Sequence, residues 1–77
     1  MFKIGDILKA NMAEAEYQYE GCKETIVYKT MMDRAEKWRF EILEDLGGDY
    51  KLRRVHDNQI ADRAKSEVHQ SMVKAND

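Results

Sequence analysis

Residues 38–55 read WRFEILEDLGGDYKLRRV, and this stretch decides the fold. Apolar residues alternate with charged residues on both sides of a glycine pair, as WRFEI before it and YKLR after it. Alternation with a period of two is typical of a strand with one buried face, and a glycine pair between two such runs is typical of a hairpin turn. We therefore predict a β-hairpin that turns at residues 47–48. The same parity places Tyr50 and Leu52 on its inner face and Arg53 on its outer face.

The neighbouring segments extend the β interpretation. Residues 24–30 read ETIVYKT, which is dense in the β-branched and aromatic residues that favour strands. Residues 56–59 read HDNQ and predict a second turn, which leads into another strand or a short helical turn at residues 60–61. We predict a mainly β domain, a small barrel with a central hairpin and a short helical segment near the C-terminus, in which residues 66–68 close the domain. Residues 69–77 are expected to form a frayed tail.

An all-α three-helix bundle is the alternative fold. Helical spacing of apolar residues also runs through the chain, and Asp6 and the glycine pair could cap two of the helices. The residues with this spacing are Leu8, Met12, Ala15 and Tyr19 in the first helix, Tyr28, Met31, Ala35, Trp38 and Ile42 in the second, and Ala61, Ala64, Val68 and Met72 in a third helix over residues 58–74.

Length and composition indicate one small domain. The chain has 77 residues, 43% of them hydrophobic, a formal net charge of −2 and no proline, so residues 1–77 are expected to form a single domain. Cys22 is the only cysteine, which excludes an internal disulfide and favours the cytoplasm. No apolar run approaches the ~20 residues of a membrane span, and residues 1–6 lack the pattern of a signal peptide.

The residues that could carry chemistry form no catalytic or metal-binding motif. A nucleophilic Cys22 would need a nearby base, and His56 and His69 are the two histidines. These three residues are too few and too widely spaced for a structural zinc site. Acidic pairs such as Glu41 with Glu44 or Asp45, and Asp57 with Asp62, are typical of solvated faces. We therefore expect a protein that is not an enzyme and that uses no cofactor or metal.

The candidate binding residues lie on a basic strip. Its members are the five residues Tyr50, Lys51, Arg53, Arg63 and Lys65. Such a strip could contact an acidic protein partner or nucleic-acid phosphates. A second interpretation is that the acidic residues 41–49 neutralise the strip across the hairpin, for example Glu44 opposite Lys51. Trp38 is expected in the core beside Phe40 and Ile42, with a role as a binding hot spot as the alternative.

Three segments resemble small SH3-like barrels, including the KOW type. They are residues 2–10 (FKIGDILKA), which resemble the opening strand, residues 38–55, which resemble the central hairpin, and residues 64–68 (AKSEV), which resemble the closing turn and strand. Residues 13–37 depart from this pattern. The resemblance implies a binding module without shared catalytic residues, of a kind common among bacteriophage accessory proteins.

We expect this module to bind a protein partner, as a modulator or inhibitor of host machinery would. The alternative is weak nucleic-acid binding through the basic strip, around residues 51–65. A net charge of −2 repels phosphate at long range, so that binding should be lost steeply with salt.

Overall fold

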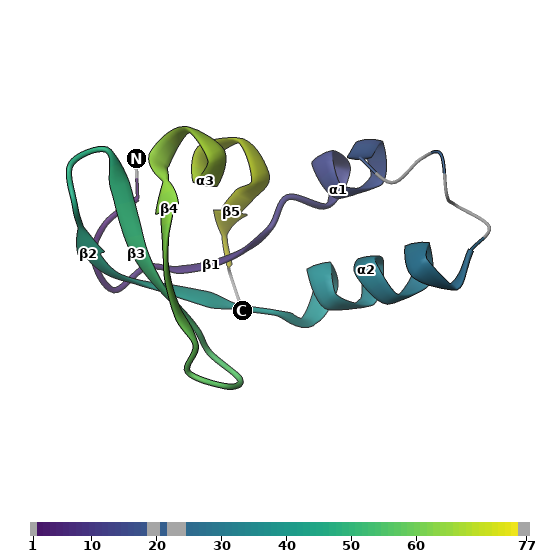
Figure 1. Ribbon diagram of the computed structural model, residues 1–77, viewed down its shortest axis with the longest axis horizontal. Helices are drawn as coiled ribbons and strands as arrows, with labels where there is room; N and C mark the ends of the chain where they lie inside the picture. The colour runs from purple at the N-terminus through teal and green to yellow at the C-terminus, as the bar shows by residue number, and fades with distance from the viewer. Residues whose placement is uncertain (1, 19–20, 22–24, 76–77) are drawn as a thin grey trace.

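The computed structural model describes residues 2–18, 21 and 25–75. Within these ranges, five strands form one antiparallel sheet in the order β4-β3-β2-β1-β5. Three short helices of the described residues accompany it (Figure 1). The elements in chain order are β1 (Ile7–Ala10), α1 (Met12–Gln18), α2 (Ile26–Lys37), β2 (Phe40–Asp45), β3 (Asp49–Arg54), β4 (Ile60–Ala64), α3 (Lys65–Ser71) and β5 (Met72–Lys74). The mainly β prediction is confirmed and the three-helix bundle is wrong.

The central hairpin is formed by β2 and β3, as predicted. Its turn depends on Gly47, whose φ of +89° is a conformation that glycine adopts without steric cost. The Asp45 carboxylate accepts a hydrogen bond of 3.0 Å from the Gly47 N–H, which holds the turn from inside. The register shifts between Ile42 and Glu44, so the hairpin contains a bulge that increases the local twist.

The second predicted turn is also present, between β3 and β4. Arg54 donates its backbone N–H to the Gln59 carbonyl at 2.7 Å, and Asn58 donates to the Arg54 carbonyl at 2.8 Å. Asn58 has a φ of 60°, a left-handed conformation that asparagine tolerates better than most residues. The turn delivers β4 to the free edge of the sheet beside β3.

The core lies on the inner face of the sheet, under α3. Its buried members are Leu8, Ile42, Tyr50, Leu52 and Val68, with Phe2 and Met72 packed against them. The predicted inward parity of Tyr50 and Leu52 is therefore confirmed. The short helical segment predicted near the C-terminus is present as α3, which carries Val68 onto the sheet. Residues 65–68 belong to this helix, not to the closing turn and strand that the resemblance implied, and the last strand of the sheet is β5.

The strand predicted over residues 24–30 is wrong where the structure describes it, because Ile26–Lys37 is the helix α2. Thr25 caps this helix, since its Oγ1 accepts a 3.2 Å hydrogen bond from the Tyr28 N–H. The β-branched residues that suggested a strand lie at the exposed start of the helix, with Ile26 80% and Val27 56% exposed. Together α1 and α2 form a helical arm that projects away from the sheet (Figure 1).

The end of the described chain is ordered into the sheet in place of the expected frayed tail. His69 and Gln70 belong to α3, and β5 pairs with β1 so that Ala10 lies opposite Met72 and Leu8 opposite Lys74. Residues 76–77 lie outside the described residues. No helix in the part of the chain that the structure describes is long and apolar enough to cross a membrane.

Candidate partner-binding surface

The cations of the basic strip are mostly neutralised by acidic residues. Arg53 donates from both Nε and Nη2 to Glu41 Oε1, at 2.9 and 2.7 Å. Lys51 Nζ lies 3.4 Å from Glu44 Oε2, which is the cross-strand pair anticipated from the sequence. A protein binds nucleic-acid phosphates when its lysines and arginines neutralise them and displace their counterions. Side chains already paired with carboxylates are not free to do so, and this pairing therefore weakens the case for a nucleic-acid surface.

The remaining strip residues lie in different settings. Lys65 Nζ lies 2.6 Å from Asp45 Oδ1 and 5.1 Å from the centroid of the Tyr50 ring. The Lys65 hydrogen bond, with help from the Gly47 N–H, lowers the pKa of the Asp45 carboxyl. Arg63 lies on the exposed strand β4 and forms no ion pair with any residue that the structure describes.

Tyr50 is a core residue, which corrects its assignment to the binding strip. Its side chain is 1% exposed, and its hydroxyl lies 3.0 Å from His69 Nε2. Phe2 and His69 both pack against its ring, with centroid separations of 6.3 and 5.6 Å. A partner cannot reach this ring without opening the core.

Arg54 points to the inner face, opposite to Arg53, and stacks on Trp38. Its guanidinium carbon lies 4.4 Å from the Trp38 ring centroid, within the range of a cation–π contact. Asp57 fixes this guanidinium by accepting from Nε at 2.9 Å and from Nη2. This pair lowers the pKa of Asp57 to about 2 and raises the pKa of Arg54.

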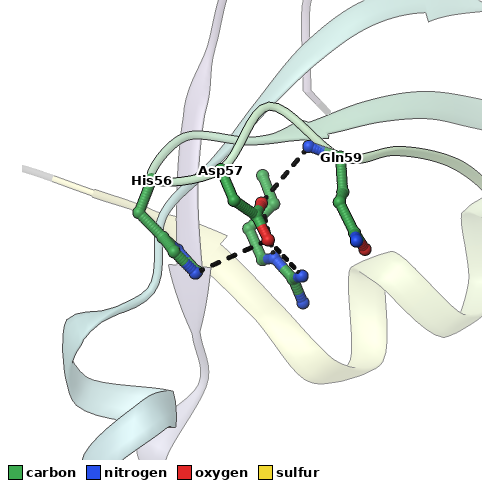
Figure 2. Close-up of polar contacts among 4 residues, drawn as sticks. His56, Asp57 and Gln59 are labelled. Atoms are coloured by element: carbon green, nitrogen blue, oxygen red, sulfur yellow. Dashed lines mark hydrogen bonds and ion pairs between the residues drawn. The ribbon is translucent and has the colours of Figure 1, made fainter.

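The turn between β3 and β4 surrounds the same ion pair (Figure 2). Asp57 Oδ1 also accepts a 3.2 Å hydrogen bond from the Gln59 backbone N–H, and His56 Nε2 lies 3.8 Å from Asp57 Oδ2. The His56 ring in turn lies against Trp38, with centroids 5.1 Å apart. Trp38 is therefore held by charged and aromatic neighbours from two elements, and it is half-buried, not enclosed in the core as expected.

Two adjoining cavities meet at Trp38. The smaller, of about 230 Å³, lies between the helical arm and the ends of β1 and β5, and the larger, of about 460 Å³, lies between β3, β4 and α3. The second volume falls within the ~300–1,000 Å³ of typical ligand pockets. Four half-buried apolar residues line both cavities: Met31, Trp38, Phe40 and Met72. We call these four residues and the two cavities the Trp38 groove.

The groove has charged groups at its rim. Arg34 lines the smaller cavity with its guanidinium carbon 5.4 Å from the Trp38 ring centroid, and Glu14 lines the same cavity. Arg54, Arg63 and Glu67 line the larger cavity. An apolar floor with a few polar groups around it is the usual composition of a site that binds another molecule.

The candidates for catalysis do not assemble into a site among the described residues. The predicted acidic pairs are divided among different cations, since Glu41, Glu44, Asp45 and Asp57 each contact a different lysine or arginine. The described residues contain no cluster of three or more His, Cys, Asp or Glu side chains that could hold a metal. Cys22 lies outside the described residues.

Sequence reasoning missed most of the groove. The parity argument placed Arg53 on the outer face but did not pair Arg54 with Trp38, because the turn that brings Asp57 and His56 beside them had no predicted geometry. The contribution of Met31 and Arg34 was missed because residues 24–30 were predicted as a strand. Helical spacing of Tyr28, Met31 and Ala35, noted for the alternative fold, was the signal that could have found it.

Comparison of the chain with protein-family models, with curated proteins and with solved structures finds no match.

Proposed function

We propose that this protein is a non-enzymatic interaction module that binds a segment of a protein partner in the Trp38 groove. The observation that carries the proposal is the set of four half-buried apolar side chains, Met31, Trp38, Phe40 and Met72, shared by two adjoining cavities. Aromatic and methionine side chains are enriched at the centres of protein interfaces, and methionine adapts its shape to a bound group. A partner side chain inserted there would remove this apolar surface from water.

The order of the strands supports a relationship to SH3-like barrels, which are binding modules. β1 lies between β5 and the meander formed by β2, β3 and β4, and a short helix precedes β5. The helical arm is inserted between β1 and β2 and supplies one wall of the groove. In this proposal the partner is bound where the arm meets the sheet.

Nucleic-acid binding is less well supported. Lys51, Arg53 and Lys65 each contact a carboxylate, so binding phosphate would require these ion pairs to break. Few counterions would be released by the one remaining strip cation, Arg63.

The proposal can be tested with peptides selected from a phage-displayed library of random 12-residue sequences on the immobilised protein. Trp38 is the only tryptophan, so its fluorescence reports directly on the groove when a selected peptide lacking tryptophan is titrated. We expect saturable changes in Trp38 emission. We also expect Met72→Ala to weaken binding at least about 10-fold, as for a residue at the centre of an interface.

Ile4→Ala is the matched control, because Ile4 is 66% exposed and does not line either cavity. Both variants are first checked for a cooperative unfolding transition. Selected peptides that bind without changing Trp38 emission, or that lose as much affinity with Ile4→Ala as with Met72→Ala, would contradict the proposal.

A further inference from the structure

The free edge of the sheet lies beside the Trp38 groove. Within the part of the chain that the structure describes, β4 pairs with β3 on one side only, and all five of its residues, Ile60–Ala64, are exposed. The opposite edge, β5, has three residues, Met72–Lys74. An exposed edge strand offers a row of backbone hydrogen-bonding groups to which another extended chain can pair.

The hydrogen bonds that flank β4 identify which of its backbone groups are free. The Gln59 carbonyl accepts from the Arg54 N–H at 2.7 Å, and the Lys65 N–H donates to the Gly48 carbonyl at 3.0 Å. In an antiparallel ladder, every second residue directs both its N–H and its C=O to the same neighbour. Since residues 59 and 65 face β3, residues 61 and 63 do so too, and Ile60 and Asp62 direct their N–H and C=O groups away from the sheet.

The side chains of the same strand connect this edge to the groove. Ala61 lies opposite Leu52 and Arg63 opposite Tyr50, so both share the inner face with these core residues. Ala61 and Arg63 also line the larger cavity. In a strand added to β4, the residues opposite Ala61 and Arg63 would point toward the same cavity, because residues that face each other across a ladder share one face.

We propose that the partner binds as an extended strand that adds to β4, with alternate side chains entering the Trp38 groove and a basic residue opposite Asp62. The inference rests on the proposed function and specifies the form of its partner. Asp62 lies on the outer face, and its carboxylate forms no ion pair with the residues that the structure describes. Opposite charges facing each other across a ladder are stabilising, so this carboxylate selects a lysine or arginine.

The same charge disfavours a second copy of this chain as the occupant. A symmetric antiparallel pairing of two β4 strands over Ile60–Ala64 is centred on residue 62. It would place the Asp62 carboxylates of the two copies opposite each other, and like charges in that position are destabilising. Charged residues on edge strands commonly prevent such self-association.

The experiment measures amide hydrogen exchange of the full chain by NMR, without and with a library-selected peptide at about 100 times its Kd. We expect exchange at the Ile60 and Asp62 amides to slow by up to about 100-fold, because exchange there would require the peptide to dissociate. The Ala61 and Arg63 amides are the internal controls, since they already face β3 and should slow much less.

A second selection on Asp62→Lys keeps the backbone and reverses the charge. Peptides selected on the wild type should carry lysine or arginine at one fixed position, and those selected on Asp62→Lys should carry aspartate or glutamate there. Peptides that change Trp38 emission but leave the Ile60 and Asp62 amides unprotected would overturn strand addition and leave the proposed function standing. Protection of these two amides without a change in Trp38 emission would support strand addition and contradict the groove. A selection that enriches no peptide would overturn both.

Discussion

Two adjacent glycines in the hairpin turn should respond differently to the same substitution. Gly47 has a φ of +89°, whereas Gly48 lies outside the left-handed region, and a Cβ at either position would meet no heavy atom within 4 Å. Alanine therefore introduces no clash at either site. The contrast between Gly47→Ala and Gly48→Ala isolates the cost of the left-handed backbone.

The expected difference in stability between the two variants follows from two effects of the substitution. Alanine lowers the entropy of the unfolded chain in both variants, which alone stabilises by about 0.4–1 kcal/mol. At Gly47 the left-handed conformation adds a penalty of about 1–2 kcal/mol. Gly47→Ala should therefore be less stable than Gly48→Ala by about 1–2 kcal/mol, and each kcal/mol corresponds to about 4–8 °C in Tm for a domain of this size.

Urea unfolding followed by far-ultraviolet circular dichroism measures this difference, with thermal unfolding as a second probe. The m-value should be the same in wild type and both variants, so that the midpoints compare stability directly. Equal midpoints for the two variants, or a lower midpoint for Gly48→Ala, would refute the assignment of the turn to Gly47.

Three further predictions concern single side chains, and a fourth concerns nucleic-acid binding by the wild type. Tyr50→Phe removes the hydroxyl that lies 3.0 Å from His69 Nε2 and should lower the free energy of unfolding by about 0.5–1.5 kcal/mol; an unchanged urea midpoint would show that this hydrogen bond contributes nothing. The folded-state pKa of Asp57 is about 2, below its ordinary value, so its contribution to stability is present above about pH 4 and is lost as the pH falls toward 2. The stability difference between wild type and Asp57→Asn should therefore shrink over that interval, and a difference that grows on acidification would contradict the ion pair with Arg54. In gel-shift titrations with DNA and RNA, the wild type should show no sub-micromolar binding at ~150 mM salt, and its appearance there would favour the nucleic-acid alternative. Cys22→Ser should bind selected peptides as the wild type does; loss of binding with folding intact would give this thiol a role.

The sequence was sufficient to predict the elements that are determined by residues close together in the chain. The hairpin was predicted because alternation and a glycine pair agree, and the core positions of Tyr50 and Leu52 follow from the same parity. The segment at residues 25–30 was mispredicted because intrinsic strand preference competed with a Thr25 cap and with strong helix formers further along α2. In addition, Thr30 Oγ1 donates a 2.9 Å hydrogen bond to the Ile26 carbonyl, which accommodates a β-branched residue in the helix.

The site was harder to predict because it depends on register and on distant segments. The pairing of Glu44 with Lys51 was anticipated from the sequence. The ion pair that neutralises Lys65 was not, because it depends on α3 starting beside the hairpin turn, where the Lys65 backbone N–H donates to the Gly48 carbonyl at 3.0 Å. The groove combines α2 with β5, which are separated by most of the sheet-forming sequence. No local pattern reports such an arrangement.

The pairing of β1 with β5 has a consequence for the folding rate. Ala10 lies opposite Met72, 62 positions further along the chain, so this ladder closes a long loop before any of its hydrogen bonds can form. The β2–β3–β4 meander involves only short loops and can form early. Contacts between residues far apart in sequence slow folding, so we expect refolding on the millisecond-to-second timescale of small β-rich domains, limited by capture of residues 72–74.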